Sequence, residues 1–252
     1  MRTRTIAFIW LLASLLVCGI ACLGQSEAGW QSRDSNYNIA ISAGGGGSIS
    51  LVVTGTNNFP SNTQITTSVD CPIGSLSVAF LSSNNVDTSP ATVSDGHSNT
   101  YTKAIQSAAT AALYTSAIYY SSNIANDIPS GSTVSESTSG GYFVAATVCI
   151  ANANSGVDVT NSLAQASAVS SFSLTTGTLA QPTEIVLGGF TPSSGWATYT
   201  EATGFTPILT GSATIGMGVA YKIVSATTSV ADNPSGASSS GTLTAVVASF
   251  KH

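Results

Sequence analysis

Apolar residues in this sequence come in short segments rich in Val, Ile, Thr, Tyr and Phe, and clusters of Gly, Pro, Asn and Ser separate these segments. This pattern is typical of β-strands joined by tight turns. Beyond the N-terminal region, no segment reads as a long helix. Many short strands with regular turns predict an all-β sandwich or barrel. The expected strands are 39–41, 49–53, 64–69, 75–81, 100–105, 112–120, 133–136, 142–151, 166–174, 184–190, 199–202, 216–224 and 242–250.

The chain also repeats itself at offsets between 98 and 110 residues. The order of the matches is the same in both halves, which predicts two related four-strand units over residues 70–155 and 180–251. Two such open sheets can bury their apolar faces only against each other, so we expect an antiparallel two-sheet sandwich with a jelly-roll-like arrangement. The matched segments are 72–80 with 182–190, 100–104 with 198–202, 117–119 with 219–221, and 144–146 with 244–246.

The N-terminus has the features of a secretory signal peptide. Arg2 and Arg4 precede an apolar run over 6–21, and small and polar residues follow it. Cleavage before Gly29 is favoured, and cleavage before a lipidated Cys22 is the alternative. The run is too short for a membrane span. We therefore expect a secreted or cell-surface protein.

The predicted domains follow from this reading: a signal peptide over 1–28, an N-terminal extension over 29–65, and the β-sandwich domain over 66–252. The extension contains a glycine-rich segment, 43–48, which is a flexible connector or a hairpin loop in the simplest interpretation. The alternative is that it tethers an exchangeable strand carrying Tyr37, Ile39 and Ile41, which would pair with a neighbouring subunit.

Two cysteines, Cys71 and Cys149, remain outside the predicted signal peptide. In an oxidising compartment a disulfide between them is the natural interpretation, and two buried free thiols are the alternative. Two thiols and two histidines offer too few neighbouring ligands for a metal site.

Charged residues make up only 7% of the chain, against about 25% in ordinary soluble domains. The formal net charge is −5, and the cations outside the signal peptide are scattered. Nucleic acid is excluded as a partner because phosphate neutralisation needs clustered Lys and Arg. A surface this poor in charge has little repulsion to prevent association, which favours a homo-oligomer or a surface polymer.

A search for catalytic motifs finds little. The sequence contains two histidines, and His97 lies in a segment typical of a turn. No nucleophile elbow, zinc-protease motif or phosphate-binding loop occurs. Glu184 and Glu201 are the weak candidates for a hydrolytic carboxylate pair. We expect no catalytic residue and predict that the protein is not an enzyme.

No cofactor or metal is expected either. Asp95 with Asn99, or Asp232 with Asn233, could supply oxygen ligands for calcium, but neither pair has the dense acidic pattern of a dedicated site. Asx turns explain these residues better.

Aromatic residues are the remaining candidates for binding. Trp196 lies in a loop rich in Gly and Ser, with Tyr199 close behind it. Exposed Trp and Tyr can stack on sugar rings, so both are possible glycan contacts. Aromatic residues in strands are more often part of the core.

Residues 93–102 read V-S-D-G-H-S-N-T-Y-T, and a strand ending in Tyr119 and Tyr120 follows. Segments 176–188 (T-G-T-L-A-Q-P-T-E-I-V-L-G) and 220–226 (A-Y-K-I-V-S-A) come later. This series resembles a largely uncharacterised bacterial β-sandwich module of secreted, surface and phage-related proteins, over roughly residues 66–251. The family commonly has glycine where Ser98 precedes Asn99. The resemblance implies a non-catalytic sandwich and transfers no active-site residue.

These observations together favour a non-catalytic structural or adhesive surface protein that self-assembles through strand edges into an extracellular polymer or filament. A carbohydrate-binding module is the alternative.

Overall fold

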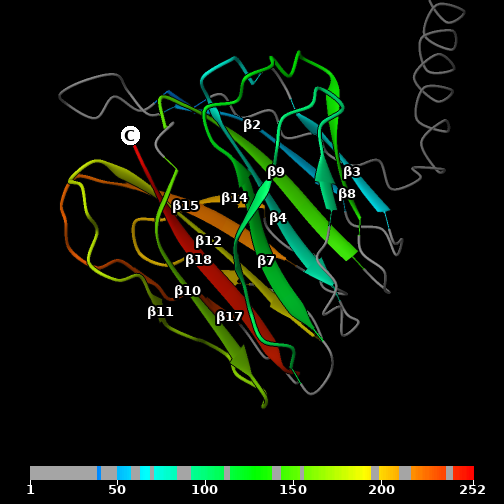
Figure 1. The fold of residues 1–252 in the computed structure, drawn as a ribbon. Coiled ribbons are helices and arrows are strands. Elements are labelled where there is room, and N and C mark those ends of the chain that lie inside the picture. The colour runs from blue at the N-terminus through cyan, green and yellow to red at the C-terminus, as the bar shows by residue number, and fades with distance from the viewer. Residues whose placement is uncertain are drawn as a thin grey trace, which may run out of the picture. The chain divides into compact units, whose positions relative to one another are not determined.

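The computed structural model of the chain describes residues 39–40, 50–57, 63–68, 71–83, 92–110, 114–137, 143–153, 156–193, 199–209, 217–236 and 241–252. The regular elements in these ranges are β-strands, and no helix occurs among them (Figure 1). All strand pairs are antiparallel. The prediction of an all-β, antiparallel fold is therefore confirmed.

Two large sheets account for most of the strands. The first has the order β1-β2-β9-β4-β7-β6 and the second has the order β10-β18-β12-β15-β14. In Figure 1 the first sheet runs from blue to green and the second from yellow-green to red. The first comprises β1 (Ile39–Ala40), β2 (Ser50–Asn57), β4 (Leu76–Ser83), β6 (Thr102–Gln106), β7 (Thr115–Ser121) and β9 (Phe143–Ala151), and the second comprises β10 (Val157–Gln165), β12 (Glu184–Pro192), β14 (Thr206–Leu209), β15 (Gly218–Val224) and β18 (Leu243–Lys251).

One apolar core joins the two large sheets, which is the arrangement of a β-sandwich. Phe80 and Val148 of the first sheet belong to the same buried cluster as Leu187 and Phe250 of the second. Alternate residues of each strand face this core, as the period of two along a strand requires. The contact is close at Gly189, where a Cβ atom would lie 2.8 Å from the Phe80 ring.

Four strands of each large sheet have the same spatial order relative to their order in the sequence. Four strands of the first sheet lie in the order β9-β4-β7-β6, and four of the second lie in the order β18-β12-β15-β14. Counted along the chain, both orders are fourth, first, third, second. Each set of four stays within one sheet.

Smaller sheets cover the outer faces of the sandwich. A three-stranded sheet of order β3-β8-β5 contributes Val93, which packs with Tyr101 on an apolar cluster around Leu81 and Tyr119. The pairs β11-β16 and β13-β17 are formed by segments that lie between β10 and β18 in the sequence, as do the other strands of the second sheet. These elements are β3 (Thr63–Ser68), β5 (Thr92–Ser94), β8 (Ser132–Ser137), β11 (Leu174–Thr175), β13 (Tyr199–Thr200), β16 (Ala231–Asp232) and β17 (Ser235–Gly236).

The segment predicted as an N-terminal extension contributes strands to the first sheet. Residues 50–57 form β2, which pairs with β9 through most of its length. Residues 39–40 form β1, which pairs with β2 over two residues.

Candidate functional sites

The predicted disulfide between Cys71 and Cys149 is present, with 5.5 Å between the two Cα atoms. Cys149 lies on β9, and Cys71 forms an isolated antiparallel bridge with Ile128. The two cysteines are buried in a small cluster with Ile124 and Ile128. The bond therefore fixes the segment before β4 to strand β9, and the bridge to Ile128 ties the loop before β8 to the same place.

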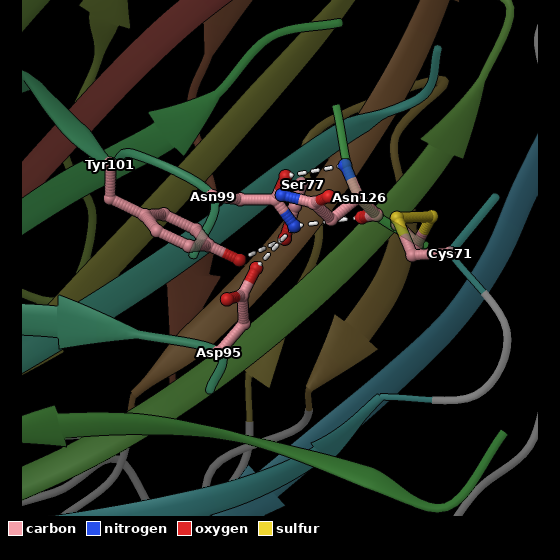
Figure 2. Close-up of a disulfide and its surroundings, with 7 residues drawn as sticks. Cys71, Ser77, Asp95, Asn99, Tyr101 and Asn126 are labelled. Carbon is pink, nitrogen blue, oxygen red and sulfur yellow. Dashed lines mark hydrogen bonds between the residues drawn. A yellow bond between two sulfur atoms is a disulfide. The ribbon is translucent and has the colours of Figure 1, made fainter. Parts of the chain in front are cut away.

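A turn beside this disulfide holds the residues of the family-like motif (Figure 2). The buried Asp95 carboxylate accepts hydrogen bonds from the His97 backbone N–H at 2.8 Å and from Asn99 Nδ2 at 2.7 Å. Asn99 Nδ2 also donates to the Asn126 carbonyl, and Asn99 Oδ1 accepts from the backbone N–H groups of Ala125 and Asn126. Both polar atoms of the Asn99 side chain are thus used to join two loops.

Two neighbours of Asn99 complete this structural role. Ser98 has a φ of 67°, a left-handed conformation that glycine adopts more easily. The Tyr101 hydroxyl lies 2.7 Å from Ser77 Oγ on β4, and burial raises the pKa of Tyr101. The motif is therefore a clasp between the turn, the neighbouring loop and the first sheet.

A second group of titratable side chains lies over the outer face of the second sheet. Asp232 on β16 is 2% exposed, and its carboxyl lies against Gly188 of β12, where a Cβ atom would overlap with it. Burial, and then the charge of Glu201, raise the pKa of Asp232 to about 7. Burial also raises the pKa of Glu201, although a contact with the Tyr199 hydroxyl opposes this change.

This carboxyl pair was not predicted as a site. Asp232 Oδ1 and Glu201 Oε1 are both buried without a hydrogen-bond partner among the described residues. Within this pair, Asp232 is almost fully enclosed and Glu201 is partly exposed. The glycine at 188 is the sequence signal for it, since glycine inside a strand often marks a close approach by another group.

The two carboxylates suggested as a weak hydrolytic pair have different neighbours. Glu184 is fully buried at the start of β12, where its backbone pairs with Lys251 of β18. Glu201 follows β13 and lies with Asp232. The structure thus brings together Glu201 with Asp232, and Glu184 with Asp158.

The first pair considered as calcium ligands has a local structural role. Asp95 and Asn99 bind each other and the surrounding backbone, as an Asx turn does. In the ranges that the structure describes, no group of three or more His, Cys, Asp or Glu side chains could hold a metal ion.

The structure describes one of the two candidate glycan contacts. Trp196 lies outside the described residues. Tyr199 is half-buried on β13, its hydroxyl donates to the Leu209 carbonyl at 2.8 Å, and its ring packs edge-on against Phe190 with 5.2 Å between centroids. Its role as a glycan contact stays a prediction.

The structure also describes only part of the candidate exchange segment. Ile39 pairs with Leu51 in the hairpin of β1 and β2. Tyr37 and Ile41 lie outside the described residues. Exchange of this segment between subunits stays a prediction.

Among the described residues, no helix is long and apolar enough to span a membrane. Comparison with known proteins finds no matching family model, no matching curated protein and no matching solved structure.

Proposed function

We propose that this protein is a non-catalytic, secreted structural or adhesive surface protein that assembles with copies of itself through the edge strand β10. The observation that carries the proposal is the contrast between β10 and the other edge strands of the large sheets. Exposed edges present unpaired backbone groups, and proteins that stay monomeric protect them with short strands, Lys, Pro or bulges.

Three edges carry such protection. Strand β6 has five residues, a bulge and Lys103. Strand β14 has four residues, a bulge and Pro207. Strand β1 has only two residues. Each of these features discourages pairing with another chain.

Strand β10 lacks these features over most of its length. It has nine residues and pairs with β18 alone within its sheet. Its register with β18 is regular from Thr160 to Gln165, beyond the bulge near its start. Asp158 is its one charged residue, and no Lys or Pro follows. The part of this edge from Thr160 to Gln165 is regular and uncharged, which supports pairing with a strand from a second copy.

Burial of carboxylates supports the same proposal. Asp95, Glu136, Glu184 and Asp232 are at most 2% exposed. The few charges of this chain are thus partly withdrawn from its surface, which leaves still less repulsion between copies. The same burial supports a non-catalytic role, because enclosed acids do not meet a dissolved substrate.

The related four-strand units predicted from the repeat are part of this proposal. Their support is the common succession of β9-β4-β7-β6 and β18-β12-β15-β14. Membership in the bacterial surface-protein module, export by the predicted signal peptide, and the jelly-roll-like description stay with the proposal as predictions from the sequence.

The occupant of the β10 edge is a strand of a second copy, and segment 36–42 is our candidate for it. Its described part, β1, pairs with β2, and the glycine-rich run 44–47 follows in the sequence. A strand on a glycine tether is suited to exchange.

The test uses the full processed chain, negative-stain microscopy and size-exclusion chromatography with light scattering. Ala164 is an exposed residue of β10, and Ala164→Lys adds the charge that guarded edges carry. Ala226→Lys is the matched control, since Ala226 is exposed in the loop after β15. We expect filaments or oligomers from the wild type and from A226K, and monomers from A164K. Uniform wild-type monomers, or assembly by A164K equal to the control, would contradict the proposal.

A further inference from the structure

Lys251, Asp158 and Glu184 meet on the outer face of the second sheet. They lie on three adjacent strands, β18, β10 and β12, with β18 in the middle. Lys251 Nζ is 3.8 Å from Asp158 Oδ1. Lys251 is the direct cross-strand partner of Glu184. Their neighbours Phe250, Val157 and Ile185 face the core, so all three polar side chains share the opposite face.

The carboxyl groups of this triad are held in place by backbone. Asp158 Oδ2 accepts a hydrogen bond from the Ala180 N–H at 2.8 Å, and Glu184 Oε1 accepts one from the Gln181 N–H at 2.9 Å. Both donors belong to one short loop. That loop contacts both carboxyl groups; the Asp158 side chain is only 10% exposed and the Lys251 side chain is 28% exposed.

Glu184 has the properties of a proton relay. It is fully buried, and its second oxygen, Oε2, has no hydrogen-bond partner within normal distance among the described residues. Burial raises the pKa of Glu184, and the adjacent Asp158 carboxylate raises it further, against contacts with Ser249 and Gln181 that lower it. A buried carboxyl group beside an ion pair favours its neutral form.

We propose that Lys251 and Asp158 form an intramolecular amide bond, with Glu184 as the acid and base that assists it. The triad brings together the three groups that such a condensation needs: an amine, a carboxyl group held still, and a buried proton carrier. Fixed proximity of the reacting groups supplies much of the required acceleration.

The reaction balances without a co-reactant. Glu184 gives its proton to the Asp158 carboxylate and takes one from the Lys251 ammonium group, which produces a carboxylic acid and a free amine. The Nζ atom then adds to Cγ of Asp158, and the C–N bond forms. The C–O bond to the hydroxyl group breaks, the nitrogen loses a proton to that hydroxyl group, and water leaves. Glu184 ends in its starting state.

The product would join the middle strand β18 to the edge strand β10 covalently. This inference is independent of assembly, because it concerns one chain and is read from the mass of that chain. The failure of one proposal therefore leaves the other open to its own test.

The experiment is mass spectrometry of the processed chain, intact and after reduction and digestion with trypsin. Without the amide, cleavage after Lys103, Lys222 and Lys251 gives the separate peptides 104–222 and 223–251. With the amide, Lys251 resists cleavage, and 104–222 stays joined to 223–252 with the mass of one water molecule missing.

Three variants assign the roles. Lys251→Arg keeps the positive charge but removes the nucleophile, so the joined peptide should be absent. Lys222→Arg, the matched control, should leave the link and the missing water intact. Glu184→Gln keeps the size of the side chain and should slow linkage by about 100-fold.

The wild-type chain alone can overturn the proposal, whatever the variants do. Separate peptides and an intact mass equal to that of the unlinked processed sequence would refute the amide bond. A joined peptide that persists in Lys251→Arg would refute the assignment to Lys251, and linkage at the wild-type rate in Glu184→Gln would refute the role of Glu184.

Discussion

Replacement of Asp232 by Asn tests whether the outer face of the second sheet encloses a protonated acid. The pKa of Asp232 lies at about 7 in the folded chain, against an ordinary value of 3.8, mainly because of burial. Between these values the folded chain keeps a proton that the unfolded chain has released. The free energy of unfolding therefore falls as the pH rises from 3.8 to about 7 and then levels off.

The size of the effect follows from the interval between the two pKa values, which corresponds to about 4 kcal/mol. Asn is neutral at every pH and has nearly the same shape. Asp232→Asn should thus remove most of this fall and leave the variant more stable than the wild type above neutral pH. Glu201, the nearest acid, can accept a hydrogen bond from the new amide.

The assay is urea unfolding at a series of values between about pH 4 and about pH 8, with the slope against pH as the readout. Asp127→Asn is the control, because Asp127 is an exposed acid outside this group. The control should keep the wild-type slope. An Asp232→Asn variant with the same pH dependence as the wild type would refute the buried, protonated state.

Two further predictions concern the first sheet. The disulfide closes a separation of 78 residues, so Cys71→Ala with Cys149→Ala should lower the free energy of unfolding by about 4–5 kcal/mol, measured in urea without reductant; an unchanged midpoint would contradict this. Asn99→Ala should lower the free energy of unfolding by about 1–3 kcal/mol, because it leaves loop backbone groups without partners. Asn126→Ala is its control, since Asn126 contributes backbone atoms to the clasp, and equal losses in the two variants would count against the role of the Asn99 side chain.

Most strands of the two sheets were predicted from local sequence, but β10 and β14 were not. The strands with strong apolar content, such as β4, β7, β9, β12 and β18, all overlap predicted segments. Strand β10 reads V-D-V-T-N-S-L-A-Q, and its side chains are partly exposed along its whole length. An edge strand of this kind lacks the alternation that marks a half-buried strand, and a strand was predicted over 166–174 instead.

The matched segments that predict the repeat do not all place equivalent residues on the same face of a sheet. The matched segments align Phe80 with Phe190, yet Phe80 faces the core between the sheets and Phe190 packs on the outer face of the second sheet. A shift of one residue reverses the face of every side chain in a strand, and an aromatic residue suits either face. Ala146 and Val246, from another matched pair of segments, do share the central core.

The triad of Lys251, Asp158 and Glu184 could not be predicted from the sequence. Its members are far apart along the chain, and only the order β10-β18-β12 brings them together. Because β10 was not predicted as a strand, nothing in the sequence placed Asp158 beside Lys251. The disulfide was easier to predict, because only two cysteines lie outside the predicted signal peptide.

The division of the strands between the sheets has a consequence for synthesis of the chain. Every strand of the first large sheet is made before any strand of the second. The apolar face that carries Phe80 and Val148 therefore has no cover while the ribosome makes the second half, and β10 and β12 have no common neighbour until β18 emerges. A nascent chain of this design depends on being shielded while its second half is made, and a ribosome stalled at mid-message releases a half-molecule prone to aggregation.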